Sequence, residues 1–152
     1  MFHPNNRFLY LLNETDASIY TFGYDVSCGG LSELQTISAL PPDFEDKPRM
    51  AADLHLTPDG RFLYASERTS HTLSAFKVDF ASGLLTFVRN VPTENWPRSF
   101  NIDPYGRYLL AVGQRSNRMT SYAIDRGTGD LTNLKEYPIG EGPNWIEIVS
   151  LQ

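Results

Sequence analysis

The stretch HPNNRFLY at residues 3–10 returns as TPDGRFLY at residues 57–64 and again as DPYGRYLL at residues 103–110. Each copy starts with a predicted turn, because proline presets the second turn position and asparagine or glycine tolerates a positive φ. A self-similar unit of this size indicates a repeat architecture. Because repeats place equivalent loops on one face, the pattern also predicts where functional side chains gather.

Further strands are predicted around each copy. The strand after the turn is followed by a polar loop, a second alternating strand, a turn with aspartate and glycine, and a third strand. One more short strand precedes the second and third turns, at 52–56 and 99–102. A complete unit therefore has four antiparallel strands, which we call strands a to d from the innermost outward. Four-stranded units repeated around an axis are propeller blades.

We therefore predict an all-β chain with about three four-stranded blades of a β-propeller. The predicted parts are strands b to d of blade 1 at 3–40, blade 2 at 49–93, blade 3 at 97–139 and an orphan strand a at 143–150. Blade 1 lacks strand a, apart from a stub at residues 1–2. Residues 40–48 are interpreted as a loop insertion. A sandwich of β-meanders is the rival fold.

The incomplete blades at both ends predict an association. Propellers usually have about 4–8 blades, so three are too few to close a ring. Open blade faces and an unpaired strand edge favour contact with further strands. Two alternatives stay open: either the chain is part of a larger propeller, or copies combine. In the second case, strand a of one copy completes blade 1 of another in a six-bladed dimer.

Length and composition bound the function classes. The 152 residues fit one domain, and a hydrophobic fraction of 41% is enough for a packed core. The formal net charge of -5 argues against a nucleic-acid surface. Cys28 is the single cysteine, so no intrachain disulfide is expected. With no basic start before an apolar stretch and no run of about 18 apolar residues, we expect a cytoplasmic protein without a membrane partner.

Strand polarity predicts that the b–c loops and the d–a connections share one face, opposite the proline-containing turns. The candidates expected there or near the central channel are Asn13, Glu14, Asp53, His55, Arg68, Arg98 and Gln114. Carboxylate, imidazole and guanidinium groups in one place can bind an anionic substrate and activate water. No histidine pair, cysteine pair or aspartate cluster has the spacing of metal ligands, so no metal site is expected.

Four segments resemble a known family. They read HPNNRFLYLLNE, AADLHLTPDGRFLYASERTSHTLSAF, WPRSFNIDPYGRYLLAVGQRSN and GPNWIEIV. They are similar to the C-terminal part of the seven-bladed propeller lactonases, which include the bacterial propeller-type 6-phosphogluconolactonase and the fungal carboxymuconate lactonizing enzyme. The resemblance covers essentially the whole chain but less than half of a family member. It implies a lactonase of carbohydrate (glucose) metabolism that hydrolyses 6-phosphogluconolactone to 6-phosphogluconate, in the pentose phosphate pathway, without an organic cofactor.

The resemblance also implies site residues. The family's catalytic glutamate falls on Glu14 and one of its arginines falls on Arg68, whereas a second arginine and a histidine fall outside this chain. We therefore expect part of a site, with Glu14 or His55 steering water onto the lactone carbonyl and Arg68 stabilising the oxyanion. Arg98 is expected to hold the phosphate, supported by Gln114 and His55, and Asn13 and Asp53 are counted as substrate-binding residues.

Two other functions stay open. One is an isomerase-like lactonizing enzyme that acts on a dicarboxylate with the same face. The other is a non-catalytic propeller that binds a protein or a ligand. Glu14 and Arg68 favour an enzyme, while the two missing family residues favour the binding module for this chain alone. A small anionic lactone is the expected partner, together with a missing N-terminal half or a second copy.

Overall fold

The computed structural model describes residues 1–41, 44 and 48–150. These residues form three antiparallel sheets and no helix. The first sheet contains β1 (Phe8–Leu12), β2 (Ser18–Asp25) and β3 (Gly30–Ser38). The second contains β4 (Ala51–Leu56), β5 (Phe62–Glu67), β6 (Thr72–Val78) and β7 (Leu85–Pro92). The third contains β8 (Pro97–Ile102), β9 (Tyr108–Gly113), β10 (Arg118–Ile124) and β11 (Leu131–Pro138).

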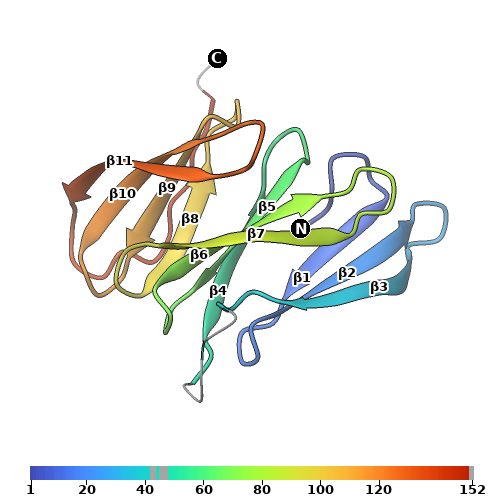
Figure 1. Cartoon of the computed structure of the whole chain (residues 1–152), viewed down its shortest axis with the longest axis horizontal. Helices are drawn as coiled ribbons and strands as arrows, with labels where there is room; N and C mark the ends of the chain where they lie inside the picture. The colour runs from blue at the N-terminus through green and yellow to red at the C-terminus, as the bar shows by residue number, and fades with distance from the viewer. Residues whose placement is uncertain (42–43, 45–47, 151–152) are drawn as a thin grey trace.

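The three sheets lie side by side as successive blades (Figure 1). Within each sheet the strands follow one another in chain order, and β4 contacts both β1 and β8 at the inner end. The predicted all-β propeller is confirmed, and the short strands expected at 52–56 and 99–102 begin one and two residues earlier, as β4 and β8. No helix of the described part of the chain is long and apolar enough to cross a membrane.

Blade 1 begins with a short remnant of strand a. Phe2 forms an isolated antiparallel bridge with Leu9, and the Met1 carbonyl accepts a hydrogen bond of 2.9 Å from the Tyr10 N–H. This confirms the expected stub. Of the loop insertion expected at 40–48, residues 42–43 and 45–47 lie outside the described residues.

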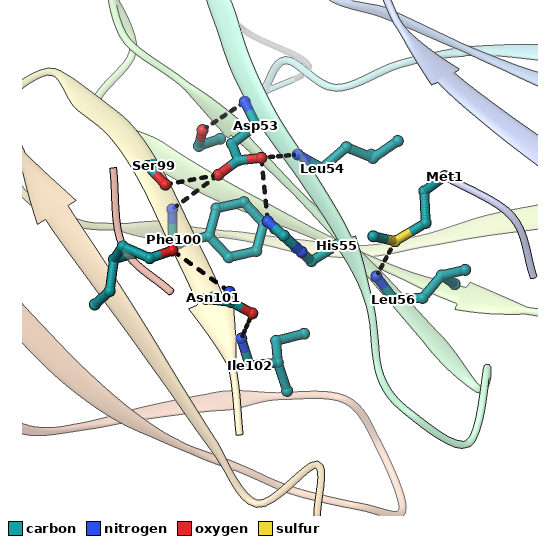
Figure 2. Close-up of polar contacts among 11 residues, drawn as sticks. Met1, Asp53, Leu54, His55, Leu56, Ser99, Phe100, Asn101 and Ile102 are labelled. Atoms are coloured by element: carbon teal, nitrogen blue, oxygen red, sulfur yellow. Dashed lines mark hydrogen bonds and ion pairs between the residues drawn. The ribbon is translucent and has the colours of Figure 1, made fainter. Parts of the chain in front are cut away.

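The strand expected at 143–150 is not formed in this structure. The segment runs beside β8, where the Asn101 side-chain amide donates a 3.4 Å hydrogen bond to the Ile146 carbonyl (Figures 1 and 2). A strand requires a ladder of backbone hydrogen bonds, and no strand of the described residues pairs with this segment. Because the sequence pattern of 143–150 matches that of β8, the strand expected there stays a prediction.

Neighbouring blades are joined by a contact that repeats. The Tyr10 hydroxyl of β1 donates to the Gly83 carbonyl of blade 2 at 2.9 Å, and the Tyr64 hydroxyl of β5 donates to the Gly129 carbonyl of blade 3 at 2.7 Å. Both glycines have a positive φ, 75° and 77°. The rings of Phe8 and Phe62 fill the space where a β-carbon on these glycines would lie. A large hydrophobic cluster thus lies at each of the two junctions between blades.

The proline-containing turns also repeat as predicted. Asn6, Gly60 and Gly106 hold the positive-φ position of the three turns, at 57°, 71° and 64°. The turns of blades 1 and 2 touch, because a His3 ring nitrogen lies 3.1 Å from the Gly60 carbonyl oxygen. We call the surface formed by these turns and the c–d turns the turn face, and the opposite surface the loop face.

Candidate functional site

The loop face contains a cavity of about 210 Å³ where the inner ends of the blades meet. It is lined by Leu12, Glu14, Ala51, Ala52, Asp53, Arg68, Arg98, Asn144 and Trp145. Four of the seven residues predicted from the sequence therefore lie around one cavity, and they come from all three blades. Glu14 and Arg68 follow strand b in blades 1 and 2, Asp53 lies on β4, and Arg98 lies on β8.

Glu14 and Arg68 form an ion pair across the junction of blades 1 and 2. The Arg68 Nε–H also donates to the Met50 carbonyl at 2.9 Å, and its Nη2 donates to the Ala51 carbonyl at 3.3 Å. The Arg68 side chain is 5% exposed, whereas that of Glu14 is 58% exposed. The guanidinium is thus fixed by the protein, and the carboxylate reaches it from the solvent side. Charge-assisted hydrogen bonds of this kind are stronger than neutral ones.

The backbone explains why these loops meet. The connection into β4 lies between the two b–c loops, since the Ala51 N–H donates to the Glu14 carbonyl at 2.9 Å and the Arg68 N–H donates to the Met50 carbonyl at 3.1 Å. The predicted sharing of one face by b–c loops and d–a connections is therefore confirmed.

Asp53 links blade 2 to blade 3 beside the cavity (Figure 2). Its Oδ2 accepts hydrogen bonds from the Ser99 hydroxyl at 3.0 Å and the Phe100 N–H at 3.1 Å, and its Oδ1 lies 3.1 Å from Nε2 of His55. Burial by itself raises the pKa of Asp53, but the hydrogen bond and charge of His55 and the donors of β8 outweigh it, so the pKa is lowered. Asp53 is therefore a carboxylate at neutral pH.

Three predicted residues do not line the cavity. His55 lies deeper along the inner strand, where it contacts Asp53 and packs edge-on against Phe100 at 5.0 Å between ring centroids. The Asn13 side-chain amide donates to the Ser18 hydroxyl at 2.9 Å within its own b–c loop. Gln114 is held by its backbone N–H, which donates to the Trp96 carbonyl at 3.0 Å.

Asn144 and Trp145 complete the cavity wall but were not among the predicted site residues. Both belong to the segment beside β8, and Asn144 occupies the repeat position of Arg98, 46 residues later. That repeat relation was the available signal for Asn144. Trp145 takes the repeat position of Ser99, so its role at the cavity could not be read from its equivalent. Within the described residues, no group of three or more His, Cys, Asp or Glu side chains is arranged to hold a metal ion.

Comparison with known proteins identifies the family. Residues 1–148 match the model of the family described as "Lactonase, 7-bladed beta-propeller". The chain belongs to this family. The 6-phosphogluconolactonase of Pectobacterium carotovorum is 46% identical over 150 residues, which cover 99% of this chain and 45% of that protein. The 6-phosphogluconolactonase of Serratia proteamaculans is 42% identical, covering 98% and 45%.

Solved structures agree with this assignment. The periplasmic gluconolactonase PpgL of Pseudomonas aeruginosa matches with a TM-score of 0.91 and 32% identity, covering all of this chain and 42% of that one. The chain thus spans less than half the length of these relatives, as the sequence resemblance indicated. The family resemblance is confirmed.

Proposed function

We propose that this chain forms part of a sugar-lactone hydrolase that converts 6-phosphogluconolactone to 6-phosphogluconate. The observation that carries the proposal is the buried Arg68 guanidinium, which is fixed by two carbonyls and directed at an exposed carboxylate on the wall of a cavity. The names of the Pectobacterium and Serratia relatives support the substrate class.

In the proposed reaction, water attacks the lactone carbonyl carbon and the bond from that carbon to the ring oxygen breaks. Glu14 accepts a proton from the attacking water and returns it to the departing ring oxygen. Arg68 donates hydrogen bonds to the oxyanion that forms at the carbonyl, where a fixed donor contributes about 3 kcal/mol of stabilisation. Protons balance within the site, so the chemistry requires no organic cofactor.

Arg98 is proposed to hold the phosphate. It is exposed on the cavity wall beside Asn144, and no ion pair holds it among the described residues. A guanidinium binds phosphate through parallel N–H donors. Asp53 is proposed to hold β8 in place on the inner side of the cavity through its hydrogen bond with Ser99. His55 is proposed to position Asp53 and not to contact the substrate itself. Asn13 and Gln114 support the loops that carry Glu14 and Arg98.

Further blades are proposed to complete the site. Tyr108 and Leu110 hold the repeat positions of Phe62 and Tyr64, but Tyr108 is 43% exposed where Phe62 is 1% exposed. At the other end, Gly29 has the positive φ of Gly83 and Gly129, at 73°, with no side chain packed on it. These two faces fit the rest of a longer propeller or a second copy. Because PpgL is named periplasmic, location in the cytoplasm stays a prediction.

A hydrolysis assay tests the proposed function. We compare the chain alone with a chimaera in which it replaces the matching segment of the Pectobacterium relative. We expect the chimaera to hydrolyse 6-phosphogluconolactone and the chain alone to be much slower. If the chimaera melts cooperatively like its parent but accelerates hydrolysis no more than buffer does, the proposal is wrong.

A further inference from the structure

Trp96 has a backbone conformation that its side chain disfavours. It lies in the bend before β8 with a φ of 62°, in the left-handed region. The other non-glycine residues with positive φ are smaller than tryptophan, and a bulky residue in this region is a genuine outlier. Its repeat equivalent, Gly142, has a φ of 61°. The residue before Pro97 and the residue before Pro143 thus share a left-handed conformation, which glycine adopts without strain and tryptophan does not.

Hydrogen bonds on both sides of Trp96 hold the strained conformation. Its N–H donates to Nδ1 of His71 at 3.2 Å, and its carbonyl accepts from the Gln114 N–H at 3.0 Å. Gly113 lets the bend approach, because a β-carbon there would lie 2.8 Å from the Asn95 carbonyl oxygen. Strain of this kind persists only where the surroundings over-determine it, and such positions cluster at functional sites.

The indole ring contacts two guanidinium groups. The Arg115 guanidinium carbon lies 3.4 Å from the ring centroid, and that of Arg68 lies 5.7 Å away. Both distances are within the range of cation–π attraction, which is stronger for a desolvated cation such as the buried Arg68. Arg115 is exposed and makes no ion pair among the described residues. The exposed Arg115 and the buried Arg68 therefore both lie within reach of the same ring.

We propose that Trp96 is a positioning residue for the cavity. The Trp96 ring fixes the plane of the Arg68 guanidinium, and the Met50 and Ala51 carbonyls accept hydrogen bonds from the N–H groups at the edge of that guanidinium. Together these contacts keep the Nη atoms of Arg68 directed at Glu14 and the cavity. The strained backbone is the consequence of placing this ring at a position where glycine suffices for the fold. The catalytic part of this inference rests on the proposed lactonase function, whereas the constraint on Arg68 does not.

Two variants separate positioning from folding. Trp96→Gly suits the backbone, as Gly142 indicates, and removes the ring, whereas Trp96→Phe keeps a smaller ring on a strained backbone. In the chimaera, we expect Trp96→Gly to lower kcat about tenfold, the equivalent of losing one strong cation–π contact, and Trp96→Phe to restore most of it. KM for the lactone should change less than twofold, because Arg98 is untouched.

A measurement that needs no activity completes the test. In the chain labelled with ¹⁵N-arginine, the Arg68 Nε–H should exchange with solvent at least about tenfold faster in Trp96→Gly than in Trp96→Phe or the parent. If exchange accelerates but the parent chimaera hydrolyses no lactone, positioning stands and the proposed function is wrong. If the parent is active and Trp96→Gly leaves both kcat and Nε–H exchange unchanged, the positioning role is wrong. A loss of kcat in Trp96→Gly that Trp96→Phe does not restore also contradicts it.

Discussion

The turn face and the loop face are built from the same three repeats but use them in opposite ways. On the turn face, equivalent positions keep equivalent residues: Arg7, Arg61 and Arg107 each lie over the ring of the next residue, at 5.3, 5.6 and 5.5 Å. On the loop face, the position after strand b changes from Glu14 to Arg68 to Gln114, in steps of 54 and 46 residues. The turn face thus repeats the same side-chain contact in each blade, whereas the loop face places different chemical groups at equivalent backbone positions.

This difference teaches how a repeat protein gains an asymmetric site. The blade fixes where a side chain emerges, so changing the residue type at one repeat position places unlike groups next to each other. The Glu14–Arg68 pair is the direct result, because both partners hold the same position in adjacent blades. Changes on the loop face should therefore alter activity more than stability, and changes on the turn face should do the reverse.

The largest effect is expected for Arg68→Ala in the chimaera. Removing a fixed oxyanion donor lowers kcat by about 10²–10³-fold. Arg61→Ala is the matched control, because Arg61 is an exposed arginine of the same blade on the turn face, and it should change kcat less than twofold. Steady-state kinetics with 6-phosphogluconolactone measure both. Equal losses for the two variants would contradict the division of roles between the faces.

The next effect concerns stability. Gly129→Ala should lower the free energy of unfolding by about 2–4 kcal/mol, because it adds a left-handed alanine and pushes a β-carbon into the Phe62 ring. Gly29→Ala is its control, since Gly29 has a similar φ of 73° but nothing within 4 Å, and it should cost only about 1 kcal/mol. Urea denaturation of the chain compares the two. If Gly29→Ala costs as much as Gly129→Ala, the blade junction contributes nothing and the interpretation fails.

The sequence predicted more of the turn face than of the loop face, for a physical reason. Turn types and strand alternation are local, so the repeats, the positive-φ positions and the strand order followed from neighbouring residues. The meeting of Glu14, Arg68, Asp53 and Arg98 followed from strand polarity alone. The features that were not predicted depend on residues far along the chain. Asp53 accepts hydrogen bonds from Ser99 and Phe100 of β8, and within the described residues no strand pairs with 143–150.

A smaller and pH-dependent effect is expected for Asp53→Asn. The lowered pKa of Asp53 means that its charged form is stabilised in the folded state, so its contribution is present above about pH 4 and is lost as the pH falls through the folded pKa. At pH 7 the variant should be less stable by about 1.5–2 kcal/mol, as for hydrogen bonds to a charged group. The urea midpoint of the parent should exceed that of the variant at about pH 5, and this difference should become smaller as the pH falls to about 3. A constant difference over that range would show that the charge of Asp53 is not what joins β4 to β8.

The smallest effect isolates one hydrogen bond of the blade junction. Tyr64→Phe removes the hydroxyl that donates to the Gly129 carbonyl at 2.7 Å and leaves the ring in place. Burial raises the pKa of this hydroxyl well above its ordinary value, so it stays a donor at every pH used for such measurements. We expect a loss of about 1 kcal/mol, because a buried carbonyl also loses its partner. Tyr10→Phe at the other junction should cost the same, since its hydroxyl donates to the Gly83 carbonyl in the same way. Unequal losses of unfolding free energy in the two variants would contradict this expectation. They would mean that the two junctions contain equivalent residues but are not stabilised equally by the tyrosine hydrogen bond.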